Sequence, residues 1–520
     1  MKKVLILSVM SVLMLFVLSC GDDNDESCTQ NEDCESGVCD KEKGECVPGN
    51  NSDENDAGKG GGNSGGDNGG ENSGGDGGGN SGGDNGGSAG DDPGQGGIYV
   101  TCTPGERREC YEGPSGTSDV GICRKGYMEC VEDGTDWSEC RDQVLPKAEI
   151  CNDGIDQNCD GEDATPGNVA DIDGDGFNYC TGDCCETEWE CAGLDPKRVS
   201  PVSFEIPNNG IDDNCDGHID EEIASICDSG INPDTVNPLD LAASMDICPV
   251  EITTYGVVSA KLLFPDGTTG DIPKQQYAVL SGYGNNLKPN AGMTFLALST
   301  GSVAETSSDT VDNKTESQPP QDWFQANGGQ TFPDSPGCQG QQNEPGKPPV
   351  NDPVMLELAI RAPNNAEAFS VDVYYFSTEF PTYVCRYNDF FVLLLDSNFT
   401  TDKAEYQNPF DKNIARDENG NPCGINLATS GLFKVCKPRP AYPSCQGDGD
   451  LTGTLFGGMT VADSHGATGW LEVRGNIVPN EEFKLRMAIW DTRDHALDSM
   501  VLLDNFKWYE SARKPGISPK

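Results

Sequence analysis

Three short acidic stretches hold the side chains in this chain that are best suited to chemistry. Two are near-copies, Cys151–Gly161 and Pro207–Gly217, which agree at eight of eleven positions, and Asp171–Gly176 lies between them. Each stretch places an oxygen-bearing side chain at every second position and then a glycine. These residues are Asp156, Asn158 and Asp160 in the first loop, Asp171, Asp173 and Asp175 in the middle loop, and Asp212, Asn214 and Asp216 in the third loop. The order is typical of the first half of a calcium-binding loop.

Carboxylates at alternate positions of a curling loop can converge on one hard cation, which takes about six to eight oxygen ligands. Without a cation, carboxylates held so close together repel each other. None of the loops contains the glutamate that closes a complete calcium loop, so the closing ligand must come from nearby. The candidates are Asp183, Glu186 or Glu188 for the middle loop and Asp220 for the third. The alternative is that Asp, Asn and Gly simply form turns, with side chains bonded to backbone amides. We expect calcium.

The composition of the 520-residue chain limits its partners. The formal net charge is -53 at pH 7, which disfavours nucleic acids and acidic membrane surfaces and favours divalent cations or basic surfaces. Hydrophobic residues make up 35% of the chain and there are 65 glycines, so part of the chain is expected not to fold. The length allows about two to four domains.

The 24 cysteines are clustered, which indicates an oxidising compartment and a disulfide framework. Zinc binding is the alternative, and the crowding of these cysteines by Asp and Gly argues against it. Adjacent Cys184 and Cys185 cannot easily bond to each other, so we expect them to connect two different segments. When Cys20 is set aside, the remaining number is odd, so one thiol is free or bonded to another molecule.

The N-terminal residues predict export and a tether. Residues 1–19 read as a secretory signal, and Val17–Cys20 resembles a bacterial lipobox, which implies lipidation of Cys20 and an outer-membrane lipoprotein exposed at the cell surface. The alternative is an ordinary cleaved signal. Residues 20–48 form a small Cys-rich segment, and residues 49–97, rich in Gly, Asn, Ser and Asp, form a disordered linker. The only membrane contact expected is through the lipid.

Residues 98–222 are expected to form small disulfide-rich modules around the acidic loops. The cysteine-rich run from Cys102 to Cys140, followed by Cys151–Gly161, resembles the "putative metal-binding motif" (MopE-type) modules of bacterial surface proteins. The resemblance implies metal binding by the acidic loops. Pro207 stands where the first copy has a cysteine, so Cys215 must pair elsewhere or stay free. Copper is associated with one member of that family, but only three histidines occur in this chain, and an all-oxygen set suits calcium.

Residues 223–511 alternate apolar and polar side chains, which predicts strands with one buried face. Leu356, Leu358 and Ile360 form one such stripe. The fold class is therefore mainly β, with a jelly-roll-like β-sandwich as the last domain and residues 512–520 as a tail. The stretches Val373–Phe391 and Met487–Val501 resemble the choice-of-anchor L domain of bacterial surface proteins, which agrees with a lipid anchor.

The same stretches suggest a second metal or ligand site. Its candidate residues are Glu379, Asn388, Asp389, Asp491, Asp494 and Asp498. They could bind calcium or the hydroxyls of a glycan, or they could cap β-turns. No metalloprotease, nucleophile-elbow or phosphate-loop motif is present.

We therefore expect a non-enzymatic, lipid-anchored surface protein whose calcium-stiffened stalk presents a β-sandwich for adhesion or recognition. A surface protein or a glycan would be its ligand. The alternatives are a glycan- or polymer-binding module and a hydrolase that uses Glu379 and Asp491 as its carboxylate pair.

Overall fold

The computed structural model divides into two compact units, residues 1–94 and 95–520, which are described separately. The structure describes residues 37–40, 45–48, 102–221, 227–250, 254–303, 315–330, 335–338, 348–386, 389–457, 465–493 and 495–520. In the first unit, β1 (Gly37–Asp40) pairs antiparallel with β2 (Glu45–Pro48). The expected signal peptide, the lipidation site Cys20 and the linker over residues 49–97 lie outside the described residues.

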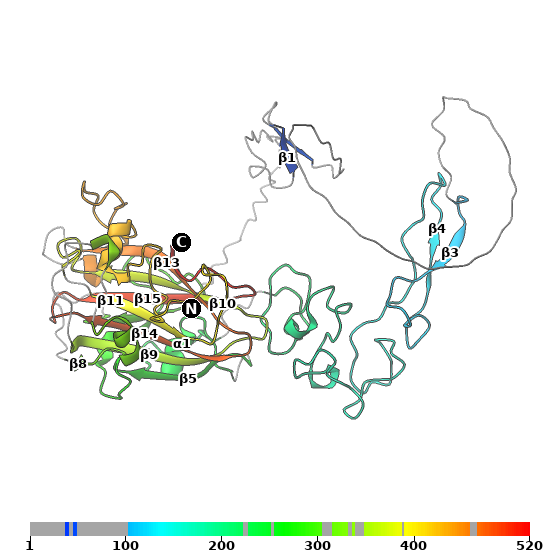
Figure 1. Ribbon diagram of the computed structural model, residues 1–520, viewed down its shortest axis with the longest axis horizontal. Helices are drawn as coiled ribbons and strands as arrows, with labels where there is room; N and C mark the ends of the chain where they lie inside the picture. Colours follow the sequence, from blue (N-terminus) through cyan, green and yellow to red (C-terminus); the bar gives the residue numbers. More distant parts are fainter. Residues whose placement is uncertain are drawn as a thin grey trace, which may run out of the picture. The chain divides into compact units, whose positions relative to one another are not determined.

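Residues 102–221 contain little regular structure (Figure 1). Disulfides hold this region together. The regular elements are the antiparallel pair β3 (Arg107–Cys110) and β4 (Gly126–Glu129) and the short 3-10 helices η2 (Tyr179–Thr181) and η3 (Pro196–Arg198). The disulfides are Cys102–Cys130, Cys110–Cys140, Cys123–Cys159, Cys151–Cys180, Cys184–Cys215 and Cys185–Cys191. The predicted disulfide framework is confirmed, and the adjacent cysteines do bond to different segments.

Two antiparallel sheets form the rest of the second unit (Figure 1). The first sheet has the order β16 (Gly516–Pro519), β13 (Gly466–Asn476), β10 (Ala368–Ser377), β15 (Ser499–Tyr509), β7 (Phe295–Ser299) and β6 (Tyr277–Leu280). The second has the order β12 (Cys423–Gly424), β11 (Phe390–Asp396), β14 (Glu482–Asp491), β9 (Val350–Arg361) and β5 (Gly256–Leu263), with β8 (Glu316–Ser317) on β9. The described α-helices are α1 (Pro238–Ala243) and α3 (Gln321–Ala326).

The main hydrophobic core lies between the two sheets. Leu356, Leu358 and Ile360 of β9 are fully buried in it, and Arg361 is exposed, so the alternation predicted for this strand is confirmed. Apolar side chains from β10, β13 and β15 of the other sheet belong to the same core. Burial of apolar surface between two sheets is what stabilises a sandwich. The predicted mainly β fold is therefore present.

The prediction of a single buried face was wrong for β10, in which every residue is buried. Tyr374 on its outer face packs in a second cluster with Tyr283 and with Leu455 and Phe456 of the 3-10 helix η8 (Leu455–Gly457), all outside the strand. Loops thus cover the outside of this sheet. Because the covering residues lie far from β10 in the sequence, the alternation within the strand could not reveal them.

The last residues of the chain also differ from the prediction. Residues 512–520, which we expected to form a tail, contain β16, and β16 pairs with β13 at the edge of the first sheet. Its Ile517 packs in the main core. A further disulfide joins Cys227 and Cys248. Cys423 is a buried free cysteine, which accounts for the odd thiol among the described residues.

The disulfide-rich region continues into the sandwich without a break. Phe204 belongs to the main core of the sandwich. Asn365 accepts a hydrogen bond from Phe204 N–H at 3.0 Å through Oδ1, and its Nδ2 donates to the Phe204 carbonyl at 2.8 Å. The Arg198 guanidinium donates to the carbonyls of Asn365 and Glu510. The segment directly before the third loop is therefore fixed to the domain that follows.

Candidate metal centre

The middle loop is curled by hydrogen bonds to its own aspartates. Asp171 accepts from Gly174 N–H through Oδ1 at 2.6 Å and from Gly176 N–H through Oδ2 at 3.1 Å. Oδ1 of Asp173 accepts from Asp175 N–H at 2.9 Å, and Oδ1 of Asp175 accepts from the N–H two residues further on at 2.8 Å. The turn-forming role, which was the alternative to metal binding, is therefore present. It uses only one oxygen each of Asp173 and Asp175.

Two acids from the next segment, Asp183 and Glu186, complete the loop. Both are buried. Oε2 of Glu186 accepts a hydrogen bond from the Ile172 N–H at 2.7 Å, so this side chain is bonded directly to the loop backbone. Oδ1 of Asp183 accepts from Cys185 N–H at 3.1 Å. Of the three residues expected to close this loop, two therefore lie at it, while Glu188 is exposed.

The remaining carboxylate oxygens of these side chains are the central feature of the site. Each of four acids has one buried oxygen that receives no hydrogen bond from the described residues. These oxygens are Asp173 Oδ2, Asp175 Oδ2, Asp183 Oδ2 and Glu186 Oε1. A buried carboxylate oxygen without a partner costs free energy, and a bound cation removes that cost.

The same acids are close enough to share a cation. One oxygen from each of Asp171, Asp173 and Glu186 lies within 4.8 Å of the others, and so does one oxygen from each of Asp173, Asp175 and Asp183. Asp173 belongs to both groups, so the two groups are neighbours. Oxygens on opposite sides of a calcium ion are about 5 Å apart, because each lies about 2.3–2.6 Å from the ion. The acids present therefore fit a calcium ion.

The electrostatics of the middle loop also favour a cation. Burial, followed by the neighbouring carboxylates of Asp175 and Glu186, raises the pKa of Asp183 to about 7. Burial likewise raises the pKa of Glu186 to about 7, with Asp173 and Asp171 adding to the effect. The pKa of Asp173 is raised chiefly by burial and is lowered in part by Lys197. A cation would stabilise all of these carboxylates in their ionised form.

The segment that carries Asp183 and Glu186 is positioned by caps and disulfides. Asn178 caps η2, since its side chain accepts from Cys180 N–H at 3.0 Å. The Glu190 carboxylate accepts from Glu186 N–H at 3.1 Å and from the Tyr179 hydroxyl at 2.7 Å. The disulfides Cys151–Cys180 and Cys184–Cys215 then connect this segment to the first and third loops.

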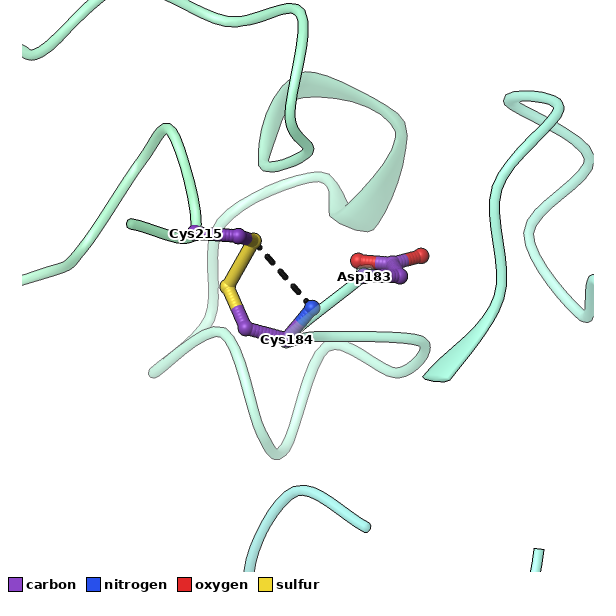
Figure 2. A group of neighbouring side chains, drawn as sticks. All are labelled: Asp183, Cys184 and Cys215. Atoms are coloured by element: carbon purple, nitrogen blue, oxygen red, sulfur yellow. Dashed lines mark hydrogen bonds between the residues drawn. A yellow bond between two sulfur atoms is a disulfide. The ribbon is translucent and has the colours of Figure 1, made fainter. Parts of the chain in front are cut away.

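Two sulfur atoms also lie near Asp183, but they do not form a metal site. Figure 2 shows Asp183 beside Cys184 and Cys215, which lie within 4.8 Å of it. Their sulfurs are joined in a disulfide, and the Cys184 N–H donates to the sulfur of Cys215 at 3.1 Å. Zinc is bound by thiolates, which a disulfide does not provide. The zinc alternative therefore finds no support at this position.

The first and third loops share one hydrogen-bond pattern. Asp156 accepts from the N–H groups of Asp160 and Gly161, and Asp212 accepts from those of Asp216 and Gly217, its equivalents. Asn158 and Asn214 accept from the same N–H groups of Asp160 and Asp216. Most oxygens of the predicted ligands in these two loops are thus used in turns.

A glutamate that we did not predict supports each of these two loops. Buried Glu149 accepts from the N–H groups of Gln157, Asn158 and Ala164, and buried Glu205 accepts from the N–H of Asn214. Each glutamate is followed by an isoleucine and lies seven positions before the corresponding aspartate, Asp156 or Asp212. The repeat therefore begins before Cys151 and Pro207, at the two glutamates. This upstream extension of the repeat could have identified Glu149 and Glu205 from the sequence.

The third loop also has acidic side chains beside it. The carboxylate of Asp220, the residue predicted to close this loop, accepts from Asn209 and Gly210 N–H and caps that turn. Glu221 lies there instead, where its Oε1 accepts from the Asn214 side chain at 3.1 Å. Buried oxygens without a hydrogen-bond partner among the described residues remain on Glu205, Asp213 and Glu221.

The residues predicted for a second metal or ligand site lie at or next to the ends of β10, β11, β14 and β15. Glu379, Asp389, Asp491 and Asp498 are all buried, while Asn388 and Asp494 lie outside the described residues. Burial holds the pKa of Asp491 well above its ordinary value, and the negative charges of Asp389 and Asp498 raise it further. Glu379 and Asp491, the pair considered for a hydrolase, are 3% and 1% exposed and therefore do not face an open cleft.

Comparisons with known proteins identify two parts of the chain. Residues 146–164 and 194–221 match the family model for the "putative metal-binding motif" of MopE type, and residues 259–507 match the choice-of-anchor L domain. Neither family is an enzyme family. Searches of curated proteins and of solved structures return no match. Among the described residues, no helix is both long and apolar enough to cross a membrane. The chain therefore carries MopE-type metal-binding motifs followed by a choice-of-anchor L domain, which indicates a cell-surface protein.

Proposed function

We propose that one calcium ion at the middle loop stiffens the disulfide-rich region, so that this region acts as a stalk for the β-sandwich. The ligands would be the side chains of Asp171, Asp173, Asp175, Asp183 and Glu186. The observation that carries the proposal is the set of four buried carboxylate oxygens that lack hydrogen-bond partners among the described residues. Five carboxylates in two groups that share Asp173 need a positive charge at neutral pH.

The chemistry of the donor set selects calcium among the common cations. All five donors are carboxylates, and hard oxygen donors suit calcium, magnesium and manganese, whereas copper and zinc prefer nitrogen or sulfur. Magnesium keeps several of its waters and requires an almost ideal octahedron, which a set of four or more protein carboxylates does not favour. Calcium-binding modules outside the cell function with dissociation constants of about 10⁻⁴–10⁻³ M.

The ion would stiffen the stalk because it joins parts that the disulfides alone leave separate. Asp171, Asp173 and Asp175 lie in the middle loop, whereas Asp183 and Glu186 lie in the segment held by Cys184–Cys215 and Cys185–Cys191. An ion bound to both adds a cross-link between the loop and this segment. The cross-link restricts backbone motion in a region with very little regular structure to stabilise it.

The remaining features of the proposal concern the place of the protein in the cell. The sequence before the described residues, with its lipobox-like Val17–Cys20, supports a lipid anchor in the outer membrane. The linker over residues 49–97 would hold the stalk away from the membrane surface. The choice-of-anchor L domain at the far end would then be free for adhesion or recognition of a surface protein or glycan. Binding of the full chain to an array of polysaccharides and surface proteins tests this part.

Hydrogen exchange of the full chain with and without calcium tests the stiffening. The amides of residues 171–186 should exchange more slowly in calcium than in chelator, because the ion fixes the loop and the segment together. Those of β9 serve as the internal reference, since the strand lies in the main core. Equal exchange of residues 171–186 in the two conditions would contradict the proposal.

A further inference from the structure

The peptide bond between Asp352 and Pro353 lies at an irregular point of β9. The register with β14 shifts there, since β9 has two residues, Asp352 and Pro353, where β14 has only Trp490. Asp352 has a backbone φ of 45°, in the left-handed region that favours glycine, and it is 1% exposed. Strained residues of this kind persist only where the surrounding structure holds them, and they gather at functional sites. The strain lies next to a proline nitrogen, which belongs to a tertiary amide and has no hydrogen to donate to the ladder.

The side chain of Asp352 is held in place on both of its oxygens. Oδ1 accepts hydrogen bonds from the N–H of Thr315 at 3.0 Å and from its hydroxyl at 3.4 Å. Nδ1 of His495 lies 2.7 Å from Oδ2. These contacts suit an ionised carboxylate, which only accepts hydrogen bonds. A carboxylate fixed this close to its own backbone carbonyl is a preorganised nucleophile, because attack on that carbonyl carbon closes a five-membered ring.

The backbone carbonyl of Asp352 has a side-chain donor directed at it. Nε2 of Gln276, which is fully buried, donates to this carbonyl oxygen at 2.7 Å. The same nitrogen lies 3.1 Å from the carbonyl oxygens of Ser299 and Thr300, which fix the orientation of the amide. A buried donor held on a carbonyl oxygen stabilises the negative charge that develops there when the carbonyl carbon is attacked. The carbonyl of the Asp352–Pro353 bond is therefore polarised for nucleophilic attack.

We propose that the chain cleaves itself between Asp352 and Pro353. The Asp352 carboxylate attacks its own carbonyl carbon, which closes a five-membered cyclic anhydride and breaks the bond to the Pro353 nitrogen. A protonated His495 gives that nitrogen its proton. One water molecule then opens the anhydride, and its two protons go to His495 and to the Pro353 amine. The net change is the hydrolysis of one peptide bond, with water as the only co-reactant.

The fold can keep its two parts together after such a cut. The disulfide Cys338–Cys385 joins a residue before the bond to a residue after it. On one side of the bond, Val350 and Asn351 pair with β8, and on the other side the rest of β9 pairs with β5 and β14. Each new chain end is therefore held by its own neighbours in the sheet. The cleavage is separate from calcium binding by the stalk and does not depend on it.

Gels and intact-mass measurements of the purified full chain, incubated at neutral pH, test the proposal. With reductant, a fragment that begins with Pro353 should appear, and without reductant the two fragments should stay joined through Cys338–Cys385. The Asp195–Pro196 bond is a control within the same chain, because Asp195 is exposed and has an ordinary φ of -66°. This bond should stay whole. A chain kept unfolded in urea should not be cleaved at Asp352, because the reaction depends on the fold.

Four variants identify the groups that act. Asp352→Asn keeps an oxygen for the Thr315 N–H but loses the nucleophile, so its chain should stay whole. Pro353→Ala, which turns the bond into an ordinary amide, should slow cleavage at least about tenfold and is the second variant should Asp352→Asn not fold. Gln276→Met and His495→Gln should each slow cleavage roughly 100-fold. A wild-type chain that stays whole, or cleavage at the same bond and rate in Asp352→Asn or in the urea-unfolded chain, would overturn the proposal.

Discussion

Replacement of Asp183 by asparagine should change the stability of the middle loop in opposite directions with and without calcium. Asp183 is 5% exposed, its Oδ1 accepts from the Cys185 N–H, and its Oδ2 receives no hydrogen bond from the described residues. Asparagine keeps the oxygen that accepts from Cys185 and replaces the other oxygen by a neutral amide group. The variant therefore removes one negative charge and one metal ligand with almost no change in side-chain volume.

Without calcium, the variant should be the more stable protein. Burial first, and then neighbouring carboxylates, raise the pKa of Asp183 from 3.8 to about 7. Each pH unit corresponds to about 1.4 kcal/mol, so ionised Asp183 destabilises the loop by at most about 4 kcal/mol above pH 7. Relaxation and water near the loop reduce this cost, and we expect the variant to gain roughly 1–3 kcal/mol in the free energy of local opening.

With calcium, the order should reverse. If the dissociation constant is about 10⁻⁴ M, about 10 mM calcium stabilises the wild-type loop by about 2.7 kcal/mol. Loss of one of five carboxylates that weakened binding about a hundredfold would reduce this gain to ~0.4 kcal/mol. Calcium should therefore stabilise the wild type much more than the variant.

Hydrogen exchange of the peptides that cover residues 171–191 measures both effects. The exchange rates give the free energy of local opening in calcium and in chelator at pH 8. Glu188→Gln, an exposed neighbour in the same segment, is the matched control and should keep the full calcium gain. An equal calcium gain in Asp183→Asn and the wild type would refute the assignment of Asp183 as a ligand.

Three further predictions follow from the contacts described above. In chelator, the stability of residues 171–186 should fall as the pH rises from about 4 to about 8, because Asp183 and Glu186, with pKa values of about 7, bind protons more tightly in the folded state. Hydrogen exchange, corrected for its intrinsic pH dependence, would measure this fall. A rise in stability over the same pH range would contradict the prediction. Glu149→Ala should destabilise the first loop by roughly 2–4 kcal/mol, because three backbone N–H groups lose their acceptor, whereas Glu149→Gln should destabilise it less. Equal hydrogen exchange of residues 149–164 in the two variants would argue against Glu149 as the acceptor that supports this loop. Leu358→Ala should cost about 2–5 kcal/mol in denaturant unfolding followed by tryptophan fluorescence, since Leu358 is fully buried, and a cost below about 1 kcal/mol would contradict its place in the core.

The acidic loops could be predicted because their signal is local. A repeat with oxygen side chains at alternate positions is visible in the sequence, and the middle loop forms as its spacing predicts. The supporting residues were harder to identify, since several acids follow each loop. Glu186 was one of three candidates for the middle loop, and Asp220 was the candidate for the third loop, where Glu221 accepts a hydrogen bond from the Asn214 side chain.

Features that depend on distant residues could not be predicted. The partner of Cys215 is Cys184, which lies 31 positions away, and nothing in the local sequence indicates this pair. The burial of both faces of β10 depends on loops near Tyr283 and Phe456. Likewise, nothing in the local sequence indicates that Asn351 of β9 lies opposite Asp491 of β14, because only the strand pairing brings these two residues together.

Anomalous diffraction from crystals of the full chain grown in calcium tests the central claim most directly. We predict a calcium peak between the side chains of Asp171, Asp173, Asp175, Asp183 and Glu186, within about 2.3–2.6 Å of their oxygens. A well-ordered middle loop with no anomalous peak among these carboxylates would contradict the account.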